Sequence, residues 1–282
     1  MMKRLGVLSL VTVASLLLLI QLQTKPAAAA KNRFWASTAK PAATTVKLST
    51  KAADDSDINA DAMAALTSMG TYLRSLKAFQ VTAVVTKDDV LDDGELIQFD
   101  TNVNLLARMP DRLRVEVTSS RQHRLYFYNG TEFTLYAQRV NYYATVPAPA
   151  TVGKLADVLD DKYGIQLPLE DLFYWGGPQS KISEIKGAID VGPTEVGGVT
   201  CEQYAFRQPG LNWQIWIQQG EFPLPRKLVI STLTDDARPQ YSSVLNWNLA
   251  PSFNDAAFTF DPPTDAQKIV FATANAADGA GK

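Results

Sequence analysis

Residues 124–136, RLYFYNGTEFTLY, place aromatic side chains on both sides of a single Asn-Gly pair. Asn-Gly between two apolar runs is typical of a β-hairpin turn. With a two-residue loop, Asn129–Gly130, each face of the hairpin would mix apolar and polar side chains. A three-residue loop from Tyr128 to a left-handed Gly130 instead gathers one apolar face, which consists of Leu125, Phe127, Phe133 and Leu135. A slip of one residue would move this whole set into solvent, so we expect the three-residue loop.

Strand patterns continue on both sides of this hairpin. The segment MPDRLRVEVTS, residues 109–119, alternates Leu113 and Val115 with charged residues, and Leu105 belongs to a similar pattern just before it. Strand signals recur about every twelve residues, and the loops between them are too short for crossover connections. The sequence therefore predicts a meander of about nine to eleven antiparallel strands, which should curl rather than stay flat.

Two segments have the periodicity of helices. Residues 57–77 repeat apolar side chains at three- and four-residue steps, with Asp57 or Asn59 as the N-cap, and residues 151–175 contain two short amphipathic helices. A curled sheet needs its concave face covered, and these helices are the available cover. The predicted fold class is α+β, mainly antiparallel β: a curled half-barrel with an N-terminal helix and a two-helix insertion as its lid. Two alternatives stay open, a concave face filled by the helices and one that leaves a cavity.

The N-terminal segment is typical of a secretory signal peptide. Lys3 and Arg4 precede an apolar run, and the small residues that follow it predict cleavage near Ala30. The apolar run is slightly long, so an uncleaved anchor is the alternative. The predicted organisation is a signal peptide at 1–30, a disordered lead-in at 31–56, the half-barrel domain at 57–270 and a flexible tail at 271–282.

Composition disfavours several function classes. Without residues 1–30 the chain has 24 Lys and Arg against 29 Asp and Glu, a net charge of −5, which argues against nucleic acid as a partner. Cys201 and His123 are the only residues of their types, which disfavours a disulfide, a zinc site and a Ser-His-acid triad. The acidic segment 88–95 lacks the spacing of a calcium loop. We expect no enzymatic activity and no bound metal or cofactor. We expect the protein to be a monomer.

Two residue pairs have alternative interpretations. Glu170 and Asp171 are adjacent carboxylates of the kind that glycosidases use, but solvated acids at a helix start are a sufficient explanation. Trp213 and Trp216 have opposite parity in one strand, so one of them should face outward. That side chain would either mark a partner surface or lie under another segment.

Six motifs support a resemblance over about residues 57–265: PDRLRVEV, YFYNGTEFTLY, NYYATVPAP, GIQLPLEDLF, WQIWI and PLPRKLVI. Together they resemble a bacterial family of predicted periplasmic proteins, domain of unknown function 2092. The plan is more distantly similar to LolA and LppX, carriers of lipidated proteins or lipids. This resemblance implies a periplasmic location and an apolar cavity between sheet and lid. Met109 stands where LolA has an arginine that latches the lid, so the resemblance implies a hydrophobic ligand in general.

The favoured function is therefore a periplasmic protein that binds or carries a lipid, an acyl chain or a lipidated protein in the half-barrel. The alternative is an envelope protein–protein interaction or sensor module with a filled core and no ligand. The candidate residues for lining the cavity come from the N-terminal helix and four strands. They are Met69, Leu73, Leu105, Leu113, Val115, Leu125, Phe127, Phe133 and Leu135.

Overall fold

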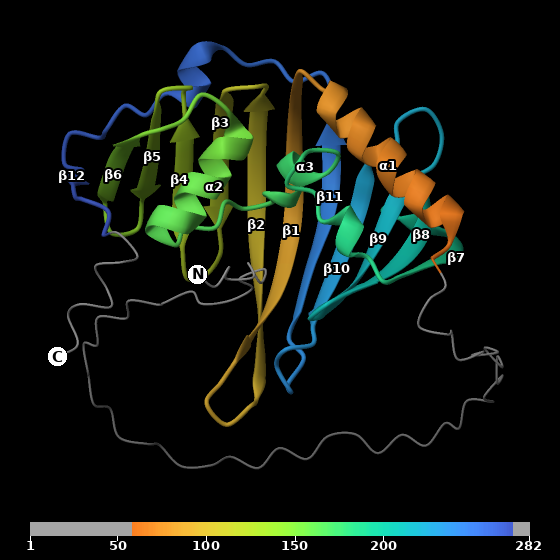
Figure 1. Cartoon of the computed structure of the whole chain (residues 1–282). Coiled ribbons are helices and arrows are strands. Elements are labelled where there is room, and N and C mark those ends of the chain that lie inside the picture. The colour runs from red at the N-terminus through yellow and green to blue at the C-terminus, as the bar shows by residue number, and fades with distance from the viewer. Residues whose placement is uncertain (1–57, 273–282) are drawn as a thin grey trace, which may run out of the picture. The chain divides into compact units, whose positions relative to one another are not determined.

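The computed structural model describes residues 58–272 (Figure 1). The predicted signal peptide, the predicted lead-in and residues 273–282 of the predicted tail lie outside this range. Within it, no helix is long and apolar enough to cross a membrane.

A single sheet organises the described residues, and it has twelve strands. The chain enters through α1 (Ala60–Ser75), whose N-cap is Asn59 as predicted, because its side chain accepts the Ala62 N–H at 2.8 Å. The first six strands are β1 (Ala78–Val90), β2 (Leu96–Arg108), β3 (Arg112–Thr118), β4 (His123–Tyr128), β5 (Glu132–Ala137) and β6 (Tyr142–Pro147). The helical insertion consists of α2 (Val152–Tyr163), α3 (Asp171–Tyr174) and the 3₁₀ helix η1 (Ile182–Glu184).

The remaining elements are β7 (Gly187–Val196), β8 (Val199–Gln208), β9 (Leu211–Gln218), β10 (Pro225–Thr232), β11 (Gln240–Asn248), η2 (Asp255–Phe258) and β12 (Gln267–Lys268). The strand order is β12-β6-β5-β4-β3-β2-β1-β11-β10-β9-β8-β7. Two meanders thus meet where β1 pairs with β11, and the sheet is open because its end strands do not pair. Only β12, beside β6, is parallel to its neighbour in this sheet.

The mainly antiparallel sheet is confirmed, but the predicted number of nine to eleven strands is wrong. The additional strand that sequence patterns do not reveal is β12, which has two residues and lies parallel to β6. A pair of residues is too short to have a recognisable alternation.

The hairpin at 124–136 forms, but the predicted register is wrong. Tyr128 pairs with Phe133, so the loop has four residues, 129–132, rather than three. The Asn129 side chain explains the longer loop, because its oxygen accepts the N–H groups of Thr131 and Glu132 at 3.1 and 2.9 Å. Gly130 has the expected positive φ, +91°.

This register changes which side chains share a face. Tyr126, Tyr128, Phe133 and Leu135 point toward the helices, as members or neighbours of the buried core there. Leu125 and Phe127 instead belong to the outer face, which we define as the face of the sheet opposite the helices. Phe127 packs there against Phe260, with ring centroids 5.3 Å apart. The prediction that Leu125 and Phe127 lie beneath the helices is therefore wrong.

The helices divide the covered face of the sheet into two cores. In Figure 1, α2 crosses in front of β3 and β4, and α1 crosses in front of β8 to β11. The first core joins β1–β5 and Leu245 of β11 to α2 and α3, and the second joins β7–β10 to α1. Leu76, Trp175, Trp247 and Leu249 pack against both cores and connect them.

Two glycines set the distance between α1 and the turn after α3. A Cβ on Gly70 would lie 2.7 Å from the amide nitrogen of Gly176 and 2.9 Å from its Cα. On the same helix, Arg74 donates from Nη1 to the Phe173 carbonyl at 2.7 Å. The position of α3 over the sheet thus depends on a backbone-to-backbone approach that only glycine permits.

Gly70→Ala should lower the free energy of unfolding, by up to about 2 kcal/mol. Alanine favours the helix by about 1 kcal/mol, but the clash with the Gly176 backbone costs more, because overpacking typically costs about 1–3 kcal/mol. Urea denaturation measures the difference. Ser68→Ala on the exposed face of α1 is the control and should leave stability unchanged or slightly higher. A Gly70→Ala protein more stable than wild type would contradict the close approach.

Candidate functional site

The predicted ligand site corresponds to the layer between the lid, α2 and α3, and the sheet beneath them. On the sheet side, Leu105, Leu113 and Phe133 are at most 1% exposed. On the lid side, Leu155 and Leu159 are equally buried. The layer is apolar on both sides, and the side chains of α2, α3 and the sheet pack directly against each other.

The nine predicted lining residues separate into three groups. Leu105, Leu113, Val115, Phe133 and Leu135 lie in the layer under α2 and α3. Met69 and Leu73 lie in the second core, between α1 and the other half of the sheet. Leu125 and Phe127 lie on the outer face, as described above.

Sequence reasoning missed several residues of this layer. Tyr126 and Tyr128 contribute two buried aromatic rings, and the correct hairpin register would have identified them. From the lid, the missed residues are Val152, Leu155, Leu159, Leu167, Leu172 and Phe173. The helical periodicity of apolar side chains in residues 152–159 would have predicted that Val152, Leu155 and Leu159 face the sheet.

Few polar contacts hold α2 on the sheet. The Val152 N–H donates to the Pro110 carbonyl at 2.9 Å, and the Tyr128 hydroxyl donates to the carbonyl of Pro149, just before the helix. The Asp157 side chain contacts α3 rather than the sheet, because it accepts a hydrogen bond from the Tyr174 hydroxyl at 3.3 Å. Beyond its N-terminal end, α2 therefore meets the sheet through apolar side chains.

A pair of carboxyl groups lies at the start of α3. Burial, and then the charge of Asp171, raise the pKa of Glu170 to about 8, while burial raises the pKa of Asp171 to about 6. One Glu170 carboxyl oxygen accepts the Leu167 N–H at 3.3 Å. Burial, and then the charge of Asp171, also raise the pKa of Tyr241 on β11. The interpretation of both acids as solvated is wrong, because the lid partly removes them from water.

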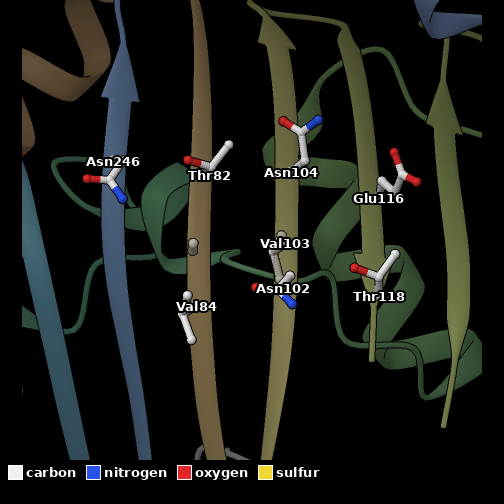
Figure 2. Close-up of a pocket in the computed structure, with 9 residues that line it drawn as sticks. Thr82, Val84, Asn102, Val103, Asn104, Glu116, Thr118 and Asn246 are labelled. Carbon is white, nitrogen blue, oxygen red and sulfur yellow. The ribbon is translucent and has the colours of Figure 1, made fainter. Parts of the chain in front are cut away.

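The outer face carries a separate groove of about 350 Å³ over β11, β1, β2 and β3. Figure 2 shows its polar side chains on the side of the sheet away from the helices; they are Thr82, Asn102, Asn104, Glu116, Thr118 and Asn246. Glu116 pairs with His123, with 2.8 Å between Oε1 and Nε2. A polar lining is typical of the solvated face of an antiparallel sheet. Among the described residues, no cluster of three or more His, Cys, Asp or Glu could hold a metal ion.

The two tryptophans of β9 point to opposite faces, as their parity predicts. Trp213 stacks on Phe206 in the second core, with ring centroids 4.3 Å apart. Trp216 lies on the outer face beside Lys227, whose Nζ is 4.7 Å from the centre of the ring. Both side chains are buried, so neither tryptophan forms an exposed partner surface.

A family model described as "Predicted periplasmic protein (DUF2092)" matches residues 62–272. The chain belongs to this family. No curated protein sequence matches it. The family description gives a location and no activity, so the function of this DUF2092 member has to be argued from its geometry.

Three similar solved structures are distant from the chain in sequence. An uncharacterized conserved protein from Thermus thermophilus is 12% identical, with 74% of this chain and 99% of that chain covered and a TM-score of 0.43. The lipoprotein LppX from Mycobacterium tuberculosis is 9% identical, with 69% of this chain and 98% of that chain covered and a TM-score of 0.36. A LolA superfamily protein from Nitrosomonas europaea is 11% identical, with 71% of this chain and 97% of that chain covered and a TM-score of 0.28.

Proposed function

We propose that this protein binds or carries a hydrophobic ligand, a lipid or other acyl chain, in the periplasm. The sheet acts as an unclosed half-barrel, and the ligand occupies the layer between the sheet and the α2–α3 lid. One observation supports this proposal above the others. Beyond its N-terminal end, α2 contacts the aromatic face of the sheet through apolar side chains.

An acyl chain can replace the apolar contacts that the lid makes with the sheet. Apolar burial is non-directional and contributes roughly 0.8 kcal/mol per CH₂ group, whichever molecule supplies the group. A chain that slides under α2 therefore replaces the contacts of Leu155 and Leu159 with equivalent ones and breaks no hydrogen bond of these side chains. The backbone and Tyr128 hydrogen bonds at the start of α2 are the polar contacts that hold the lid on the sheet.

A second candidate, an interaction module with a filled core, is favoured by a different observation. Leu105, Leu113 and Phe133 are already at most 1% exposed beneath the lid, which leaves their surfaces covered without a ligand. On this alternative the lid stays closed and the protein functions through its surface. The two candidates differ in whether apolar molecules enter the layer.

Uptake of a fluorescent fatty acid by the purified protein tests the proposal. Wild type should bind it, and Leu113→Asp should abolish binding and lower stability, because an unpaired buried charge is expensive. Tyr128→Phe should accelerate uptake several-fold, because it removes one of the hydrogen bonds that hold the start of the lid.

Asn102→Asp supplies the matched control, since it introduces the same charge at an exposed position of the outer face. It should leave uptake unchanged. If wild type binds no fatty acid and Tyr128→Phe gains no binding, the interaction module becomes the better account.

A further inference from the structure

The hairpin of β1 and β2 extends beyond the rest of the sheet. Each strand has 13 residues, whereas the other strands have ten or fewer. Pairing of β1 with β11 ends at Lys87, and pairing of β2 with β3 begins at Asn102. Residues 88–101, which we call the β1–β2 tip, therefore form strand pairs only with each other, and Figure 1 shows them projecting past the helices and the neighbouring strands.

The tip presents apolar side chains that cover no core. Leu91, Leu96 and Ile97 are 41%, 40% and 37% exposed. Leu96 pairs directly with Val90 on one face of the hairpin, and Ile97 lies on the other. A lone two-stranded hairpin gains little stability in water, and apolar residues gathered at its end contribute nothing to the folded cores. This arrangement is typical of a contact surface.

Negative charge surrounds these apolar residues. From Thr86 to Asp100 there are six Asp and Glu residues and one lysine, a net charge of −5. Some of these carboxylates serve the fold: Asp88 accepts the Gln240 N–H at 2.9 Å, and Asp93 accepts the Glu95 N–H at 3.1 Å. The exposed carboxylates of Asp92 and Glu95 have no hydrogen-bond or ion-pair partner within residues 58–272.

We propose that the β1–β2 tip docks on a protein partner whose surface offers an apolar pocket rimmed by lysine or arginine. An apolar centre within a charged rim is the usual anatomy of a protein–protein interface. The carboxylates would steer a cationic partner toward the tip, and they would repel the anionic surface of a membrane. This interaction does not depend on whether the lid admits a ligand.

Site-specific photo-crosslinking of the full chain in its native cells tests the proposal. A photoreactive p-benzoyl-phenylalanine replaces Leu96, and a matched control carries it at Asn104, on the same face of β2 but within the sheet. The Leu96 probe should give one discrete protein adduct, cross-linked at a Lys- or Arg-rich surface, and the Asn104 probe should not.

A variant with three neutralised carboxylates tests whether the negative charge of the tip contributes to the contact. The triple variant Asp89→Asn, Asp92→Asn and Glu95→Gln leaves Asp88 and Asp93 in their hydrogen bonds. It should reduce the adduct at least tenfold while shifting the melting temperature by less than about 2 °C, because the tip lies outside both cores. An undiminished adduct, a lipid adduct, a cross-link to a second copy of this chain or the absence of any discrete adduct would overturn the proposal.

Discussion

Leu113→Ala should lower the free energy of unfolding by about 2–5 kcal/mol, the range for truncating a fully buried leucine. Leu113 is 1% exposed and belongs to the core beneath α2 and α3, so the shortened side chain leaves a cavity between lid and sheet. The spread of the range reflects how far the lid can collapse into this space. Urea denaturation of the two proteins side by side measures the loss.

Leu233→Ala is the matched control, because Leu233 is 40% exposed and its truncation should change stability by less than about 0.5 kcal/mol. Adding a fatty acid should then raise the melting temperature of Leu113→Ala more than that of the control, because the ligand fills the new cavity. A loss below about 1 kcal/mol at Leu113 would contradict the closed packing of this layer.

Glu170→Gln should stabilise the protein by about 2–4 kcal/mol at pH 8 and have little effect near pH 4.5. Burial, and then the charge of Asp171, raise the pKa of Glu170 from 4.5 to about 8, so between these values the folded protein holds a proton that the unfolded chain has released. The stability from this group is fully present below pH 4.5 and is lost as the pH rises through 8. Glutamine stays neutral and keeps an oxygen that can accept the Leu167 N–H.

The pH profile of the difference between wild type and Glu170→Gln reports on Glu170 and on the groups that its charge influences, such as Asp171 and Tyr241. Glu184→Gln, at an exposed position of η1, is the control, and it should change stability by less than about 0.5 kcal/mol at pH 8. A difference for Glu170→Gln that stays flat from pH 4.5 to 8 would mean that the Glu170 carboxyl is solvated, as its sequence context first indicated.

Local patterns in the sequence predict most of the elements of this fold. Alternation around Leu113 and Val115 identifies a strand whose inner residues the structure buries. The stripe through Met69 and Leu73 identifies a helix that buries these two residues. Such patterns follow from the periods of the backbone itself, so they are readable without knowledge of the partner elements.

The features that sequence patterns do not predict depend on contacts between distant residues or on a single side chain. The position of α1 depends on such a contact, because the Asn59 N–H donates to the Ala188 carbonyl of β7 at 3.0 Å, and Met69 lies in the second core rather than beside Leu113. The hairpin register depends on the hydrogen bonds of the Asn129 side chain, which lengthen the loop by one residue. The predicted three-residue loop would place Phe127 beneath the helices, whereas the observed register places it on the outer face.

Native mass spectrometry of the full chain, purified from its own cell envelope without added lipid, tests the central claim most directly. A hydrophobic-ligand carrier with an exchangeable lid should retain part of its cargo, so the spectrum should contain a second species heavier by the mass of one lipid or acyl-chain molecule. Leu113→Asp should lack this species while Asn102→Asp keeps it. A spectrum with only the mass of the protein, from material that also takes up no fatty acid in solution, would contradict the account.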